Sequence, residues 1–198
     1  MAKTIRLVRV TRQTGEFHQI KKLYRTAFPF RERVPFFLLD KKSNQGYADF
    51  WGAYDGDEWV GFAYVIRGDG LAYLFYLAIR PELRGTGCGS ATLKALRETY
   101  QNENFFLALE QQDPKAKNYP ERIRRHAFYE KNGLHDLPHR IREMTMVYDA
   151  MGTASVVAPS DFATMTRRFF GRFLYPLIHT KIIPDAGKSN IESIQERK

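Results

Sequence analysis

The stretch Arg84-Gly85-Thr86-Gly87-Cys88-Gly89-Ser90 carries the residue types best suited to chemistry in this chain of 198 residues. Its three alternating glycines permit positive φ angles and let backbone N–H groups come close to a ligand. The stretch follows an apolar run, Leu71 to Ile79, and precedes a segment rich in Ala and Leu that is typical of a helix. N–H groups at a helix start bind anions, and Arg84 adds a positive charge. The loop therefore predicts a phosphate or pyrophosphate site.

Two common nucleotide-binding motifs do not fit this loop. A P-loop ends in Gly-Lys-Ser/Thr, and no lysine stands between Arg84 and Ser90. A Rossmann fingerprint needs G-x-G-x-x-G after the first strand of a βαβ unit, whereas here the glycines alternate and three predicted strands joined by hairpins come before them. A glycine-rich connection without a ligand remains the alternative.

The elements that position the loop follow the order β-α-α-β-β-β-α-β-α-β. Asp55-Gly56-Asp57 and Gly68-Asp69-Gly70 are turn signals between strand-like runs, and they predict two successive hairpins. We therefore expect an α/β fold with a mixed sheet and a central antiparallel meander. The predicted strands are 4–10, 47–54, 58–67, 71–79, 105–109 and 143–150, and the predicted helices are 16–28, a short one after Pro35, 90–100 and 120–131.

Two runs resemble signatures of the GNAT superfamily of N-acyltransferases. Residues 77–90 are similar to its acetyl-CoA motif, Arg/Gln-x-x-Gly-x-Gly/Ala after the fourth strand, with Arg84, Gly87 and Gly89 at the fixed positions. Residues 127–134 are similar to its Phe-Tyr-Glu-Lys-x-Gly-Phe run, with Leu134 where Phe is usual. The resemblance covers residues 4–150 and implies the GNAT fold, in which the fourth and fifth strands splay apart.

The resemblance also implies where acetyl-CoA binds. The backbone of Leu77 and Ile79 would bind the pantetheine arm in the cleft between the splayed strands. A backbone N–H near Leu77 or Ala78 would polarise the thioester carbonyl. The pyrophosphate would be held by Gly85, Thr86, Gly87, Cys88, Gly89 and Ser90.

Acyl transfer to an amine needs an acid for the departing thiolate and a base for the amine proton. By resemblance the acid is Tyr129, with a packing role on a buried helix face as the alternative. Our candidate base is Glu110, which follows the predicted strand 105–109 and would have its pKa raised by partial burial at the cleft rim. A strand-end glutamate facing solvent is the alternative, and Glu32 is a weaker candidate base.

The segment after the first helix commonly lines the acceptor pocket in this superfamily. We therefore expect Phe28, Phe30, Glu32 and Phe36 to contact the substrate. Cys88 lies at a helix start, where a thiol pKa can fall, but no histidine is near it in sequence and we expect only its backbone to act. The five histidines show no metal-ligand spacing, so we expect no metal.

Charge and composition limit the partners. The net charge is +9, and residues 1–50 hold eleven Lys and Arg against four Asp and Glu. Such an excess favours anionic partners, but no zinc-finger spacing, RNA-binding strand signature or basic heptad run accompanies it, which makes nucleic acid an unlikely ligand. The longest apolar run, Leu71 to Ile79, is too short to cross a membrane, and residues 1–10 do not resemble a signal peptide. We expect a soluble cytoplasmic protein.

We expect two regions, a GNAT domain at 1–150 and an extension at 151–198. Ser160-Asp161 could cap a helix in the extension, and the last fourteen residues are polar and read as a flexible tail. The extension could be a docking helix or a homodimer contact. The predicted function is transfer of an acetyl group from acetyl-CoA to a primary amine, by direct attack in a ternary complex. The alternatives are a CoA-binding regulatory module without turnover and a basic nucleic-acid-binding protein.

Overall fold

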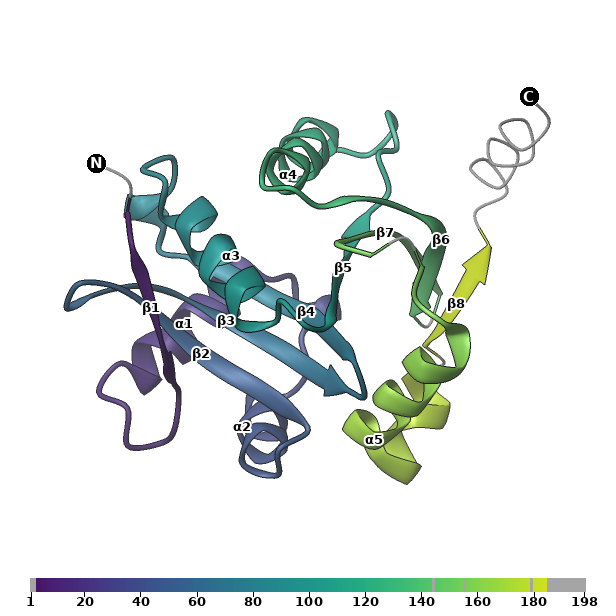
Figure 1. The fold of residues 1–198 in the computed structure, drawn as a ribbon, viewed down its shortest axis with the longest axis horizontal. Helices are drawn as coiled ribbons and strands as arrows, with labels where there is room; N and C mark the ends of the chain where they lie inside the picture. Colours follow the sequence, from purple (N-terminus) through teal and green to yellow (C-terminus); the bar gives the residue numbers. More distant parts are fainter. Residues whose placement is uncertain (1–2, 144, 155, 179, 185–198) are drawn as a thin grey trace. The chain divides into compact units, whose positions relative to one another are not determined.

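The computed structural model describes residues 3–143, 145–154, 156–178 and 180–184 (Figure 1). The chain divides into two compact units, each of which is described by itself. The first unit comprises residues 1–67 and 72–102, and the second comprises residues 68–71 and 103–198. Within the described residues, no helix is both long enough and apolar enough to cross a membrane.

The first unit has four neighbouring strands in the order β1-β2-β3-β4. β1 pairs with β2, and β2 with β3, in antiparallel register. Its strands are β1 (Ile5–Arg9), β2 (Ala48–Asp55), β3 (Glu58–Gly68) and β4 (Leu71–Ile79). Its helices are α1 (Phe17–Ala27), α2 (Phe36–Asn44) and α3 (Cys88–Thr99), with short 3₁₀ turns η1 (Phe30–Glu32) and η2 (Pro81–Leu83). The expected α/β fold class and the meander β2-β3-β4 are confirmed.

The two faces of these strands pack against helices in different ways, because alternate strand residues point to opposite faces. On the face covered by α1 and α2 the core is aromatic: the ring centroids of Phe50 and Tyr64 lie 5.3 Å apart, and those of Tyr24 and Tyr76 lie 5.0 Å apart. On the face covered by α3 (Figure 1) the core is small and aliphatic. That cluster consists of Ile5, Ala53, Val60 and Cys88, with Leu7, Ile79, Leu83, Ala91 and Ala95 packed against it.

Among its described residues, the second unit has four strands in the order β5-β7-β6-β8, all paired antiparallel. The strands are β5 (Asn104–Glu110), β6 (His135–Glu143), β7 (Met146–Gly152) and β8 (Lys181–Pro184). Its helices are α4 (Tyr119–Lys131) and α5 (Pro159–Ile178), and α5 is interrupted at Gly171, whose φ is +76°. Phe162 of α5 is fully buried and lies 6.0 Å from Phe106 of β5, ring centroid to centroid.

Two strands of this unit do not appear among the predicted elements. β6 contains Pro138 and several charged residues, a sequence that reads as a loop, and its pairing with β7 shifts register between Asp136 and Arg140. β8 is short, and it belongs to the region in which we expected a helix and a tail. The helix is present as α5, whereas residues 185–198, the expected flexible tail, lie outside the described residues. The boundary at residue 150 stays a prediction.

Candidate active site

The glycine loop in the first unit leads directly into α3. Gly87 is the residue before the helix, with φ +90°, and Gly85 has φ +78°, so both adopt the left-handed conformation that glycine tolerates best. The Thr86 hydroxyl donates to the Leu83 carbonyl at 2.7 Å and holds the loop in its turn. No side chain of the described residues caps α3 at Gly87, so the first N–H groups of the helix are available to an anion.

Cys88 is the first residue of α3 and is fully buried. Its thiol packs among Ile5, Ala53 and Val60, and the Thr86 hydroxyl lies 3.3 Å from the sulfur. A thiol so enclosed packs beneath the loop, and a role for the backbone alone of this residue stays a prediction. Residues 84–87 are exposed, which leaves the outer side of the loop open to a ligand.

The C-terminal half of β4 carries the predicted pantetheine contacts. Ala78 is buried, whereas Leu77 and Ile79 are partly exposed. β3 approaches this segment very closely at Gly61: a Cβ built there would lie 2.3 Å from the Ala78 carbonyl oxygen and 3.0 Å from Ile79 Cα. A β-bulge at this point of β3, where Ala53 pairs with Gly61 and Tyr54 with Trp59, accounts for the irregular spacing. Gly61 is therefore required by space.

Replacing Gly61 with alanine is expected to push β3 away from β4 and to lower the free energy of unfolding by about 1–3 kcal/mol, as overpacking does. Urea denaturation measures the loss. Gly15→Ala is the matched control, because a Cβ at Gly15 meets nothing within 4 Å. Equal stability of the two variants would show that β3 and β4 are not this close.

The four predicted acceptor residues lie between α1 and the start of α2. Phe28 packs edge-on against Tyr76 of β4, with ring centroids 4.7 Å apart. Phe30 is 83% exposed, and the Arg33 guanidinium lies 5.3 Å from the centre of its ring. Glu32 closes the turn η1, and its side chain is partly exposed. The structure thus places three of the four in one short segment of the first unit.

Phe36, the fourth, lines a cavity of about 340 Å³. The carboxylate of Asp40 is buried there, and it accepts hydrogen bonds from Arg12 Nε at 2.7 Å and from Asn44 at 3.2 Å. The cavity combines aromatic walls with basic groups. Its lining residues are Arg12, Phe17, His18, Lys21, Phe36, Phe37 and Asp40.

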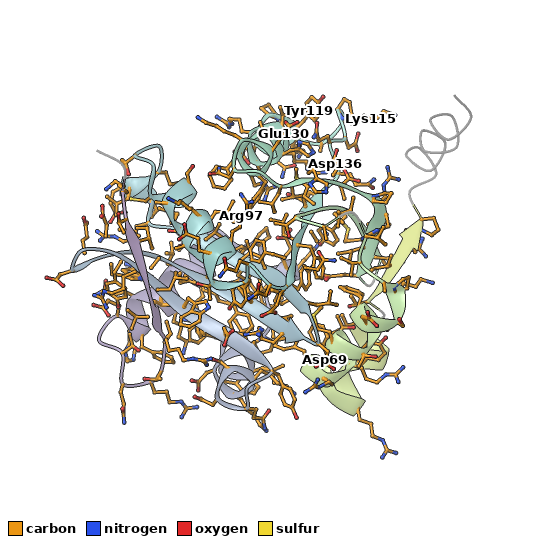
Figure 2. All side chains as sticks on the ribbon, in the orientation of Figure 1. Asp69, Arg97, Lys115, Tyr119, Glu130 and Asp136 are labelled. Carbon is orange, nitrogen blue, oxygen red and sulfur yellow. The ribbon has the colours of Figure 1, made fainter. Side chains whose placement is uncertain are left out.

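In the second unit, Glu110 ends β5 and its carboxylate is held by α4. Figure 2 labels Tyr119 at the start of α4 and Glu130 near its end. Arg122 lies 3.0 Å from Oε1, Arg125 pairs with Oε2, and the Asn118 amide lies 3.4 Å from both oxygens. Arg122 is fixed in turn, donating to the side chain of Asn118 at 2.9 Å and to the Gln111 carbonyl at 2.7 Å. Residues 118, 122 and 125 are spaced to share one helix face.

The expected rise in the pKa of Glu110 is wrong. Burial does act to raise this pKa, but the hydrogen bond and charge of Arg125, together with Asn118 and the charge of Arg122, outweigh it and lower the pKa below its ordinary value. Glu110 is therefore ionised throughout the neutral range. Its alternative as a strand-end glutamate facing solvent is also wrong, because its side chain is only 15% exposed.

Tyr129 lies on α4 four residues beyond Arg125, on the same helix face. Burial raises the pKa of its hydroxyl to about 12, and the charge of Arg125 acts in the opposite direction. The helix ends two residues later, at Lys131. Gly133, at φ +79°, donates to the Glu130 carbonyl, and Leu134 donates to the Tyr129 carbonyl at 3.1 Å. These two bonds form a Schellman motif, so the Asn-Gly-Leu run fixes the backbone of Tyr129.

Several functional contacts were not foreseen. The sequence did contain a signal for three of them: the spacing of Asn118, Arg122 and Arg125 places these residues on one helix face. His126 Nε2 lies 2.8 Å from Asp136 Oδ1, a pairing that was not predicted from the sequence. The predicted cofactor residues belong to the first unit, and the predicted acid and base both belong to the second.

A sequence model of a known family matches part of this chain. Residues 46–134 match the sequence model of the family described as "Acetyltransferase (GNAT) domain". That segment runs from before β2 to the end of the Schellman motif, so it contains both the glycine loop and Tyr129. No curated protein matches the chain.

Solved structures share the fold at low sequence identity. A GNAT-family acetyltransferase described as putative, from Bacteroides thetaiotaomicron, aligns with a TM-score of 0.65 and 20% identity, covering 86% of this chain and 96% of that one. An aminoglycoside 6'-N-acetyltransferase in complex with coenzyme A gives 0.57 and 16%, over 78% and 99%. The ribosomal-protein-S18-alanine N-acetyltransferase of Escherichia coli gives 0.52 and 17%, over 78% and 96%. Residues 46–134 of this chain therefore match the GNAT acetyltransferase domain, and the chain shares its fold with solved GNAT-family acetyltransferases.

Proposed function

We propose that the enzyme transfers an acetyl group from acetyl-CoA to a primary amine, by direct attack in a ternary complex. The observation that carries the proposal is the start of α3, where Gly85 and Gly87 both take positive φ and no side chain of the described residues caps the helix. Exposed N–H groups and the charge of Arg84 suit a pyrophosphate. The backbone of Leu77, Ala78 and Ile79 is the proposed contact for the pantetheine arm and the thioester.

In the proposed reaction the amine nitrogen attacks the thioester carbon, the carbon–sulfur bond breaks and an amide forms. Tyr129 supplies the proton for the departing thiolate. Its pKa of about 12 keeps the hydroxyl protonated at neutral pH, as this role requires. Glu110 is the proposed base for the amine proton. With its lowered pKa it is unprotonated at pH 7, but it is a weak base and its oxygens already accept from Asn118, Arg122 and Arg125.

The acceptor class stays open between small amines and protein amines. The two similar enzymes named above act on an aminoglycoside and on an alanine of a ribosomal protein, and both groups are amines. We place the acceptor against Phe28, Phe30, Glu32 and Phe36. Release of CoA from acetyl-CoA, followed with a thiol reagent, identifies the acceptor when an aminoglycoside, a polyamine and peptides with a free N-terminal alanine or a lysine are compared.

Gly87→Glu is the test of the cofactor site. A carboxylate before α3 would oppose the phosphates, and we expect the Kd for acetyl-CoA, measured by calorimetry, to rise about tenfold or more. Gly46→Glu is the matched control, because Gly46 also has positive φ (+76°) and open space around its Cβ. Equal Kd values for the two folded variants would contradict the loop assignment, and tight binding without CoA release for any amine would favour a regulatory module.

A further inference from the structure

The segment between α1 and α2 is fixed by two buried tyrosines of the first unit. Tyr76 of β4 donates its hydroxyl proton to the Glu32 carbonyl at 2.6 Å and accepts from the Val34 N–H at 3.1 Å. Tyr24 of α1 donates to the Val34 carbonyl at 2.8 Å. Together the two hydroxyls thus bind backbone atoms of Glu32 and Val34.

These three hydrogen bonds can exist together. A tyrosine hydroxyl has one proton to give, and here Tyr76 gives its proton to Glu32 and Tyr24 gives its proton to Val34. The N–H of Val34 supplies the third. The 3.3 Å between the two hydroxyl oxygens is then a contact without a proton of its own. Burial raises the pKa of Tyr24 to about 12, so that hydroxyl keeps its proton at neutral pH.

The two rings also hold the start of the segment. Phe28 lies 4.7 Å from Tyr76 and 5.7 Å from Tyr24, ring centroid to centroid. Other backbone hydrogen bonds of the segment, such as those from Glu32 to Pro29 and from Arg33 to Phe30, are local. Tyr24 and Tyr76 supply long-range hydrogen bonds to the backbone of the segment from the buried core, whereas Phe30 and Arg31 are exposed.

We propose that Tyr24 and Tyr76 are positioning residues that set the shape of the acceptor site by fixing the backbone of Glu32 and Val34. The proposal rests on the proposed function in one respect, the assignment of Phe28, Phe30 and Glu32 to the acceptor. The aromatic core on the α1–α2 face thereby acts on acceptor recognition, and does more than stabilise the fold. Neither tyrosine needs to touch the substrate.

Tyr76→Phe tests the proposal, because it keeps the ring and removes the hydroxyl that binds the Glu32 carbonyl and the Val34 N–H. Tyr64→Phe is the matched control: Tyr64 is equally buried in the same core, and its hydroxyl donates to the Leu39 carbonyl of α2 at 2.9 Å. Each variant loses buried hydroxyl–backbone bonding, so both are expected to lose stability. Only Tyr76→Phe releases the segment before α2.

The first readout is limited trypsin cleavage of the folded protein without substrate. We expect faster cleavage after Arg31 and Arg33 in Tyr76→Phe than in Tyr64→Phe, about tenfold, from one lost net interaction of the usual size. The second readout is steady-state kinetics with the fastest amine of the panel above. Tyr76→Phe is expected to raise the KM for the amine about tenfold while the Kd for acetyl-CoA is unchanged.

Equal cleavage rates and equal amine KM values for the two variants would overturn the proposal that Tyr24 and Tyr76 position the segment. That result differs from a failure of the proposed function, in which the parent enzyme itself releases no CoA with any amine. The cleavage experiment does not depend on turnover, so it decides the structural part of the proposal in either case.

Discussion

Tyr129→Phe is expected to lower kcat by about 10²–10⁴-fold, the range for loss of a general acid. The change removes one oxygen and keeps the ring that packs 5.0 Å from Phe128, so the fold and the Kd for acetyl-CoA should be preserved. Because burial raises the pKa of Tyr129 to about 12, deprotonation of this residue should cause no decline of the wild-type kcat between pH 7 and about pH 10. Stopped-flow or steady-state measurement of CoA release gives both results.

Tyr119→Phe is the control for this experiment. Tyr119 begins the same helix (Figure 2), is also partly buried, and has no proposed role in the reaction. A Tyr129→Phe enzyme as fast as Tyr119→Phe would reduce Tyr129 to a packing residue, which was the alternative interpretation of its sequence motif. The Schellman motif keeps the backbone of residue 129 in place, because its carbonyl stays bonded to the Leu134 N–H in either variant.

The glycine loop was predictable because local chemistry determines it. Positive φ at Gly85 and Gly87 and the start of a helix at Cys88 follow from residue types within a few positions. β6 was not predictable in the same way, since Pro138 and its charged neighbours are unfavourable in a strand and only pairing with β7 and β8 makes one. Long-range contacts override local preference there.

The ionisation of Glu110 illustrates a second reason why sequence-based prediction fails. Its place at the end of a buried strand was visible in the sequence, and burial alone raises the pKa of a carboxyl group. The opposing charges come from Arg122 and Arg125, twelve and fifteen residues away, and their effect depends on α4 folding back against the end of β5. The sign of the shift is thus a tertiary property, although the residues that cause it can be read from their helical spacing.

Glu110→Gln is expected to destabilise the protein by about 3 kcal/mol at pH 7, because Arg122, only 16% exposed, would lose its anionic partner. The pH dependence has a definite sign. A carboxyl with a lowered folded-state pKa stabilises the fold above its unfolded pKa and loses this effect as pH falls through the folded value. The stability gap between wild type and Glu110→Gln, measured with urea, should therefore be full at pH 7 and shrink below about pH 4.

The same variant separates a base from an anchor when it is compared with Arg122→Gln. Both substitutions break the ion pair that joins β5 to α4, but only Glu110→Gln removes a proton acceptor. If Glu110 is the base, kcat/KM should fall about 10²-fold or more in Glu110→Gln, and this fall should exceed any loss in Arg122→Gln. Because Glu110 is already ionised at pH 7, the deficit should stay constant from pH 6 to 9, whereas any rise of the wild-type rate in that range belongs to deprotonation of the amine. Equal rate losses in the two variants would mean that Glu110 acts only by holding α4, and with it Tyr129, in place; the amine proton would then leave through water or Glu32.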